Sequence, residues 1–208
     1  VAETHVVELD PMLLKAKEKL LKSAKSLDLP NFVTGNFSWP DKADNGIPKT
    51  IGWLISEGKV LHDRHEYKTW KGNPKGTFIV YKNGQVEVGW KWDSEIMKVV
   101  SDIWFCYQGF NLYPPKMTVK QGIAAEGFEY ATVGYSTNRV SIGYNKDTGK
   151  AIIAVRPNSD AERAVLTMGN LGCENAAICS DSGISAVLGV DGKKYLSTDR
   201  VLSNIIYW

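Results

Sequence analysis

The chain has 208 residues, with 25 lysines and arginines against 23 aspartates and glutamates, so its formal net charge is +2. A chain of this length can bury enough surface to fold without a disulfide or metal staple. The near-neutral charge argues against a nucleic-acid binder with a broad basic face. Three cysteines are too few for a disulfide scaffold. No apolar run approaches the roughly 18–20 residues that span a bilayer.

The first part of the chain predicts a strand and then a helix. Val6 to Leu9 has strand character, and Asp10-Pro11 favours a helix start with Asp as the N-cap. Leucines and alanines then recur at three- and four-residue steps as far as Leu27, with lysines on much of the remaining surface. Pro30 would end this helix. We interpret residues 1–29 as a strand and a docked surface helix, and we disfavour the alternative of a membrane-surface helix.

The middle of the chain predicts a series of β-hairpins. Glu57-Gly58, Asn83-Gly84 and Asp147-Thr148-Gly149 each lie between two β-like segments. Asn-Gly between alternating segments is the strongest short hairpin signal. Three further elements are expected: a strand over 31–37, a loop over 40–48, and a short helix leading into a strand over 95–105.

The last quarter predicts a helix and a buried strand. Ser159 and Glu162 have the spacing of a capping box, an apolar stripe runs from Ala161 to Leu171, and Gly172 suits the C-cap position. Asn175 to Cys179 follows as a short strand. Strands outnumber the two clear helices, which predicts an α+β fold: a mixed, mainly antiparallel β-sheet with helices packed on it, in a single domain.

Asp181 is the residue most suggestive of chemistry. It closes an apolar strand, and the small residues of Ser182-Gly183 beside it would let a ligand approach the backbone closely. The alternative is a turn-forming aspartate that accepts hydrogen bonds from nearby amides. Taken alone, the residues favour this alternative.

Two arginines are candidates for binding an anion. Arg139 opens a strand after the polar residues 136–138, where a guanidinium could clamp a phosphate or carboxylate with two hydrogen bonds. The alternative is an exposed arginine at a sheet edge. Arg200 has the same two interpretations, with local pairing to Asp199 as a third.

The histidines and cysteines predict neither a metal site nor thiol catalysis. His62 and His65 are three residues apart, but no third ligand is evident. Cys173 and Cys179 could form a disulfide only if the intervening turn brought them close. Dinucleotide and phosphate-loop motifs are absent, so no cofactor is predicted. Among the seven tryptophans, Trp39 is our candidate for stacking on a sugar ring, and core packing is the general alternative.

Several segments together resemble the phosphodiester glycosidase family in a bacterial or phage-type form. The family hallmark is a helix ending in Leu-Gly, a strand, and Leu-Asp-Gly-Gly-Gly-Ser. Here Leu171-Gly172 is followed by a strand and by Ser180-Asp181-Ser182-Gly183-Ile184-Ser185, in which Ser182 and Ile184 replace two glycines. Four more segments resemble family motifs in the family's order: Thr34–Phe37, Ile55–Lys59, Arg139–Gly143 and Arg200–Asn204. The resemblance covers residues 30–208, within a chain that we take as one domain over 1–208.

The resemblance implies one pocket that cleaves a sugar-1-phosphodiester or a related glycosidic linkage. It implies catalytic roles for Asp181, Ser185 and Arg139, and substrate-binding roles for Arg200, Asn36, Gly183, Ser182 and Trp39. Arginines would neutralise the phosphate, and the carboxylate would support an oxocarbenium ion or activate water. A second carboxylate would come from Asp160, Glu162, Asp191 or Asp199.

The expected partner is a glycan or sugar-phosphate substrate on a cell-surface or cell-wall glycoconjugate, with no nucleic acid, no membrane span, no cofactor and no metal. The expected setting is extracellular, cell-wall or phage-particle associated. Because Ile184 adds a side chain where the family has glycine, one alternative is an inactive module that binds a phosphorylated glycan or nucleotide-sugar-like ligand. Another is a structural domain of a larger phage or cell-wall protein.

Overall fold

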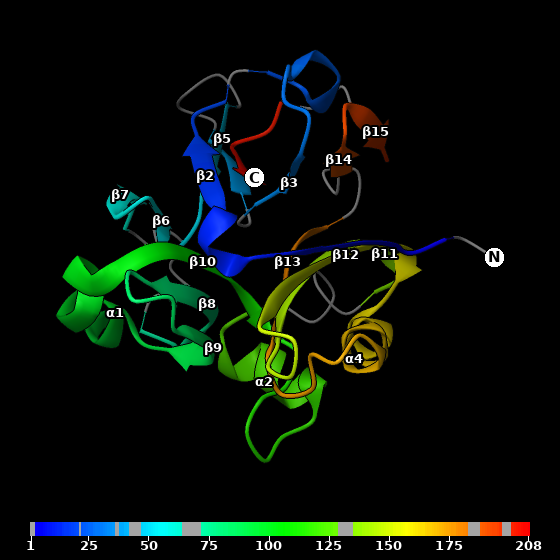
Figure 1. The fold of residues 1–208 in the computed structure, drawn as a ribbon. Helices are drawn as coiled ribbons and strands as arrows, with labels where there is room; N and C mark the ends of the chain where they lie inside the picture. The colour runs from blue at the N-terminus through cyan, green and yellow to red at the C-terminus, as the bar shows by residue number, and fades with distance from the viewer. Residues whose placement is uncertain are drawn as a thin grey trace.

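A nine-stranded sheet forms the centre of the fold (Figure 1). The computed structural model describes residues 3–20, 22–35, 38–41, 47–63, 72–128, 135–182, 188–196 and 201–208, and only the backbone of 38–41, 47–49 and 180–182. The strands of the large sheet are β1 (His5–Leu9), β6 (Leu54–Ser56), β7 (Lys59–His62), β8 (Lys75–Tyr81), β9 (Val86–Lys91), β10 (Ile103–Asn111), β11 (Thr137–Asn145), β12 (Lys150–Ser159) and β13 (Ala177–Ser182). Their order is β1-β12-β11-β13-β10-β6-β7, and the β8–β9 hairpin pairs with β10 through β8.

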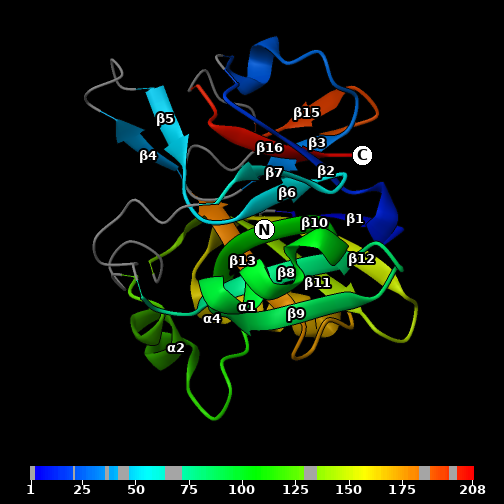
Figure 2. The same cartoon turned by 90° about the vertical axis from the view of Figure 1, so that its left-hand side faces the viewer.

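A five-stranded sheet packs on one face of the large sheet, and helices cover the other face (Figure 2). The small sheet has the order β15-β14-β3-β16-β2, with strands β2 (Lys15–Glu18), β3 (Phe32–Thr34), β14 (Leu188–Val190), β15 (Lys193–Tyr195) and β16 (Asn204–Tyr207). A separate pair is formed by β4 (Ser38–Asp41) and β5 (Ile47–Thr50). The described α-helices are α1 (Asp93–Val99), α2 (Val119–Ala125) and α4 (Ala161–Asn170).

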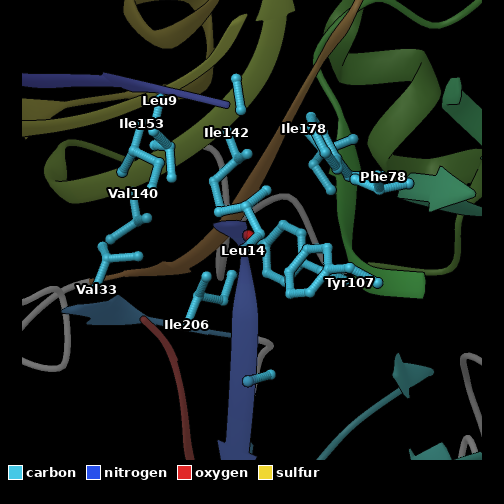
Figure 3. Close-up of a cluster of buried hydrophobic side chains, with 14 of the residues drawn as sticks. Leu9, Leu14, Val33, Phe78, Tyr107, Val140, Ile142, Ile153, Ile178 and Ile206 are labelled. Atoms are coloured by element: carbon cyan, nitrogen blue, oxygen red, sulfur yellow. The ribbon is translucent and has the colours of Figure 1, made fainter. Parts of the chain in front are cut away.

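Apolar cores hold these layers together. The inter-sheet core joins the two sheets, and Figure 3 shows Val33 and Ile206 of the small sheet beside Val140 of β11. The α2–α4 core packs Phe110 and Cys179 of the large sheet against both helices, and the α1 core packs Cys106 under α1. All strand pairs of both sheets are antiparallel, so the predicted α+β class is confirmed.

The predicted hairpins are confirmed. Glu57-Gly58 joins β6 to β7, Asn83-Gly84 joins β8 to β9, and 147–149 joins β11 to β12. The Glu57 and Gly58 backbones both have positive φ, as a two-residue hairpin turn requires. The short helix before a strand near residue 95 is confirmed as α1 and β10.

The predicted N-terminal helix is wrong. Asp10 does cap a turn, with its carboxylate accepting a hydrogen bond from the amide of Met12, but the turn ends as a 3-10 helix at Leu13. The chain then extends into β2, which pairs with the C-terminal strand β16. The alternation Lys15-Ala16-Lys17 suits a strand with Ala16 buried, and pairing with a distant segment outweighed the local helical pattern.

Two smaller predictions need correction. The N-cap of α4 is Asp160 instead of Ser159, because Ser159 remains in β12, and Asp160 accepts the hydrogen bond from the Arg163 amide. The expected loop over 40–48 contains the ends of β4 and β5, with Pro40 opposite Pro48. The disulfide that the sequence left open between Cys173 and Cys179 is not formed, and both thiols are buried in the α2–α4 core. Helix α2 was not predicted.

Glycine at position 143 lets α4 pack on the large sheet. A Cβ on Gly143 would lie 2.7 Å from the Cys173 Cβ and 2.9 Å from the Ala176 carbonyl oxygen. We expect Gly143→Ala to lower the free energy of unfolding by about 1–3 kcal/mol because the segment after α4 that contains Cys173 and Ala176 must shift outward. The control is Gly169→Ala within α4, whose nearest new contact is 3.4 Å, and which should gain up to about 1 kcal/mol in a denaturant titration. Equal effects of the two substitutions would contradict this account.

Candidate active site

One face of the large sheet is apolar at both ends and polar between them. Side chains on β10 alternate between the two faces, so Gln108 lies on the helix side with Cys106 of the α1 core and Phe110 of the α2–α4 core. Thr77 is directly opposite Gln108 on β8. On β11, Val140 points into the inter-sheet core, so Arg139 points to the helix side. These three polar side chains are each at least 97% buried.

The register of the strands places Gln108 and Arg139 in one row across the sheet. Phe110 of β10 is opposite Cys179 of β13, and Cys179 is opposite Ser141 of β11. Both β10 and β11 run antiparallel to β13, so they run in the same direction. Gln108 and Arg139 are each two residues before this level, on strands that lie on either side of β13 in the sheet order.

The hallmark segment enters the same row. Arg139 is directly opposite Ser182 of β13, after a register shift that follows the Ser141 pairing. Asp181 and Ser182 therefore bring their backbone between Gln108 and Arg139. We call Thr77, Gln108, Arg139 and the backbone of Asp181–Ser182 the polar row.

Strand β10 changes its pairing partner at the polar row. The edge of β10 that faces β13 pairs with that strand at Phe110 and Asn111, and it pairs with β6 at Cys106 and Tyr107. Gln108 lies between these two pairings. Strand β13 leaves β10 after Cys179 and stays with β11, so the polar row lies where neighbouring strands diverge.

The Arg139 guanidinium is buried but not fully paired. Its Nε donates to the carbonyl oxygen of Ser159 at 3.3 Å, and its Nη2 donates to the carbonyl oxygen of Tyr135 at 2.7 Å. The Tyr135 ring lies 5.7 Å from the guanidinium carbon. Among the described residues, the buried Nη1 has no hydrogen-bond partner. A buried cation with an unused donor is costly unless an anion accepts from it, which makes this the best anion-binding position in the row.

Hydrogen bonds fix the other end of the row. The Gln108 side chain accepts from the Trp53 amide at 2.8 Å and donates to the Thr77 hydroxyl at 2.9 Å. The Thr77 hydroxyl donates to the Lys75 carbonyl oxygen. The Trp53 indole donates to an Asp93 carboxylate oxygen at 3.1 Å, at the first turn of α1. These bonds link the row to α1 and to the start of β8.

A buried carboxylate beside the row was missed by the sequence analysis. Glu126, which follows α2, is fully buried, and its two carboxylate oxygens accept from the amides of Gly76 and Asn111 and from the Trp90 indole at 2.7–2.8 Å. The Lys75 ammonium donates to the Glu126 main-chain carbonyl at 2.6 Å. No sequence motif marks Glu126. The only signal is the Lys75 charge in an otherwise apolar strand.

Burial moves the pKa of Glu126 and the pKa of Lys75 toward neutral pH. Loss of hydration raises the pKa of Glu126 to about 7, against the stabilising N–H donors and the Lys75 charge. Loss of hydration lowers the pKa of Lys75 to about 8, against the negative charges of Glu126 and Asp93. The pair therefore changes its charge in the physiological range.

A second pair of predicted segments meets in the small sheet. Gly35 follows β3 and approaches Asn204 of β16, with its amide donating to the Asn204 carbonyl at 3.4 Å. A Cβ on Gly35 would lie 2.1 Å from the Asn204 Oδ1, so only glycine fits there. The Asn204 amide also donates to the Thr50 hydroxyl at 3.1 Å. The structure thus joins Thr34-Gly35 to Asn204-Ile205, as it joins 139–143 to 177–182.

Several predicted site residues are outside the described part of the chain. These are Asn36, Gly183, Ser185 and Arg200, and also His65 and Asp199. Trp39 is described only by its backbone in β4. For these residues the site assignments stay predictions.

The remaining candidates for a second carboxylate lie outside the row. Asp160 is occupied as the α4 N-cap, and Asp191 is exposed in the turn between β14 and β15. Glu162 is exposed on α4 and lines a surface cavity of about 320 Å³ with Tyr113 and Pro114. No residue of the polar row lines this cavity.

The described ranges contain neither a candidate metal cluster nor a candidate membrane-spanning helix. His62 contacts the Gly52 carbonyl through its Nδ1 at 2.8 Å, and the described residues contain no group of three or more histidine, cysteine, aspartate or glutamate side chains that could hold a metal. Within the same residues, no helix is long and apolar enough to cross a bilayer.

Comparisons with known proteins identify the fold. No family model matches the sequence, and no curated protein matches it. The catalytic domain of zebrafish N-acetylglucosamine-1-phosphodiester alpha-N-acetylglucosaminidase, auto-inhibited by its pro-peptide, is similar with a TM-score of 0.72 and 14% identity over 100% of this chain and 82% of that chain. A Burkholderia pseudomallei K96243 protein described as exported has a TM-score of 0.67 and 9% identity over 98% and 73%. A hypothetical protein from Synechocystis has a TM-score of 0.56 and 11% identity over 98% and 58%. The chain therefore shares its fold with the catalytic domain of a phosphodiester glycosidase.

Proposed function

We propose that the protein is a hydrolase that cleaves the glycosidic bond of a sugar-1-phosphodiester, with the polar row as its active site. The observation that carries this proposal is the buried Arg139 guanidinium, whose Nη1 has no hydrogen-bond partner among the described residues, on a residue that β11 pairs with Ser182 of β13. A glycosyl phosphodiester needs an anion-binding group and a carboxylate, and the register brings Arg139 to the backbone segment that contains Asp181. The shared fold with a phosphodiester glycosidase supports the same reaction class.

In the proposed mechanism the arginines stabilise negative charge, and Asp181 stabilises the sugar cation or takes a proton from the attacking water. Arg139, with Arg200, would hold the phosphate and stabilise the negative charge that grows on it as the glycosidic bond breaks. Asp181 would stabilise the oxocarbenium-like sugar or activate the attacking water. Ser185 would assist in this step. Substrate contacts are proposed for Asn36, Ser182, Gly183 and Trp39.

The substrate setting is part of the proposal. A glycan or sugar-phosphate conjugate on a cell surface or cell wall carries the bond that this site would cleave. An extracellular setting is supported by the fold shared with a protein described as exported. Association with a phage particle stays a prediction from the sequence.

Turnover of a small panel of glycosyl-1-phosphodiesters tests the proposal, with N-acetylglucosamine-1-phospho-6-mannoside as one member. Asp181→Asn keeps the size of the side chain and removes its charge. We expect the wild type to release free sugar and Asp181→Asn to lose at least about 100-fold in rate. The control substrate is the same glycoside without phosphate, which should react far more slowly because Arg139 has nothing to bind.

The same panel distinguishes the alternative of a binding module. If no member is cleaved but a member raises the melting temperature of the wild type, the protein holds a phosphorylated glycan without turnover. If Asp181→Asn cleaves within a few-fold of the wild type, Asp181 has no catalytic role and the proposed mechanism is wrong.

A further inference from the structure

Glu126 connects the ends of three strands at one carboxylate. One oxygen accepts from the Gly76 amide of β8, and the other accepts from the Asn111 amide of β10 and the Trp90 indole of β9. All three donors are N–H groups, so the arrangement fits an ionised carboxylate. A protonated carboxyl would accept more weakly through its O–H oxygen, and its proton would find no acceptor among these three N–H groups.

The hydrogen-bond partners of the Lys75 ammonium likewise fit its charged form. It donates to the main-chain carbonyl of Glu126 at 2.6 Å, and the carbonyl oxygens of Asn73 and Pro74 lie 3.4 and 3.5 Å away. A neutral amine would have fewer protons for these acceptors and an idle lone pair. The hydrogen-bond geometry therefore fits the pair in which both groups are charged.

This pair is joined to the polar row by a short chain of hydrogen bonds. The Lys75 carbonyl accepts from the Thr77 hydroxyl, which accepts from the Gln108 amide, and Gln108 accepts from the Trp53 amide. The backbone is closely packed at the Glu126 end of this chain of hydrogen bonds. A Cβ on Gly76 would lie 2.4 Å from the Asn111 nitrogen, so the two backbones are in close contact. Movement of Gly76 would be passed to Thr77, its neighbour in β8.

We propose that Glu126, with Lys75, is a positioning pair whose charge state sets the conformation of the polar row, so that the row is competent for catalysis only when the carboxylate is ionised and the ammonium is charged. Glu126 does not touch substrate in this proposal, because its oxygens are occupied. The catalytic consequence rests on the proposed function. The conformational coupling from Glu126 to Trp53 does not.

The charges that act on the pair come from few elements. Within the described residues, Lys75 of β8 acts on Glu126, and Glu126 and Asp93 of α1 act on Lys75. Strands β9 and β10 present neutral N–H donors to Glu126, from Trp90 and Asn111. With the pKa of Glu126 at about 7 and that of Lys75 at about 8, the doubly charged pair predominates in a narrow range of pH. A bell-shaped pH profile is the expected result.

The test is an NMR titration of the full chain from pH 5 to pH 9, with activity measured in parallel. The Trp90 indole N–H reports on Glu126 directly, and the Trp53 main-chain N–H reports on Gln108. Trp90→Phe and Trp53→Phe assign the two signals. We expect both signals to shift together with a midpoint near pH 7, and kcat to rise at that midpoint and to fall again as Lys75 loses its charge near pH 8, with KM changing less.

Three variants separate coupling from simple structural support. In Glu126→Gln both shifts should disappear and the acid limb of the kcat profile should flatten. In Thr77→Val the Trp90 shift should remain and the Trp53 shift should be lost, because the hydroxyl link is cut. Glu162→Gln, which changes an exposed carboxylate, should behave as the wild type.

The outcomes of this titration test the inference separately from the proposed function. A Trp90 signal that does not shift between pH 5 and 9, or a Trp53 signal that ignores the Trp90 midpoint, overturns the inference. Both signals shifting in a protein without turnover on any glycosyl phosphodiester would support the coupling and count against the proposed function alone.

Discussion

Replacing Arg139 with lysine is expected to lower the turnover of a glycosyl-1-phosphodiester by about 100-fold or more. Lysine keeps the positive charge but has one nitrogen in place of three, so it cannot bond to the Ser159 and Tyr135 carbonyls and still present a donor to the phosphate. Loss of a preorganised donor to developing negative charge typically costs two to three orders of magnitude in kcat. Steady-state kinetics with the reactive member of the panel measures the effect.

The matched control is Arg156→Lys. Arg156 lies directly opposite Arg139 on β12, but its Nη1 donates to the Thr167 hydroxyl of α4. Its replacement should leave kcat within a few-fold of the wild type. Equal losses in the two variants would mean that the guanidinium at 139 supports the sheet and plays no part in binding phosphate.

Replacing Glu126 with leucine is expected to lower the free energy of unfolding by about 3–5 kcal/mol at pH 5. The substitution leaves the buried N–H groups of Gly76, Asn111 and Trp90 without their acceptor. Urea denaturation followed by tryptophan fluorescence measures the difference.

The stability difference between wild type and Glu126→Leu should also depend on pH. The pKa of Glu126 is about 7 in the folded protein, above the ordinary value of 4.5. The folded state therefore holds this proton more tightly than the unfolded chain, and its stabilising effect is complete below pH 4.5 and lost as the pH rises to 7. The difference should shrink by up to about 3 kcal/mol over this interval.

Glu162→Leu is the control for both effects. Glu162 is exposed on α4, so its replacement should change the free energy of unfolding by less than about 0.5 kcal/mol at either pH. A constant difference between wild type and Glu126→Leu from pH 4.5 to 7 would show that burial does not raise the pKa of Glu126. A loss below about 1 kcal/mol would show that the three N–H groups find other acceptors.

Local signals in the sequence predicted the hairpins and the last helix. Asn83-Gly84 and Glu57-Gly58 specify tight turns through their own backbone preferences, so nothing distant decides them. Gly172 ends α4 because the amides of Gly172 and Cys173 bond back to Gly169 and Met168, an arrangement that requires positive φ.

Distant pairing explains what the sequence could not predict. Lys15–Glu18 has a helix-compatible pattern, but it becomes an edge strand because the C-terminal β16 offers it a ladder about 190 residues away in sequence. The capping box at Ser159 failed for a related reason: β12 extends to Ser159 because β11 pairs with it there, at Thr137.

The candidate site also contains residues that the sequence identified and residues that it could not identify. The sequence singled out Arg139 and Asp181, and strand register places the first opposite the residue that follows the second. Gln108 and Glu126 carry no motif, and their importance depends on which strands diverge and which amides lose their partners at strand ends. Such features arise only when the whole sheet is assembled.

The most direct test of the central claim is the position of the oxygen that water delivers. A glycosyl-1-phosphodiester would be hydrolysed by the wild type in water enriched in oxygen-18, and both products would be analysed by mass spectrometry. A site that cleaves the glycosidic bond with help from Asp181 places the label on the anomeric carbon of the sugar and none in the phosphate monoester. Label in the phosphate monoester would show attack at phosphorus, and it would contradict the glycosidase mechanism proposed for the polar row.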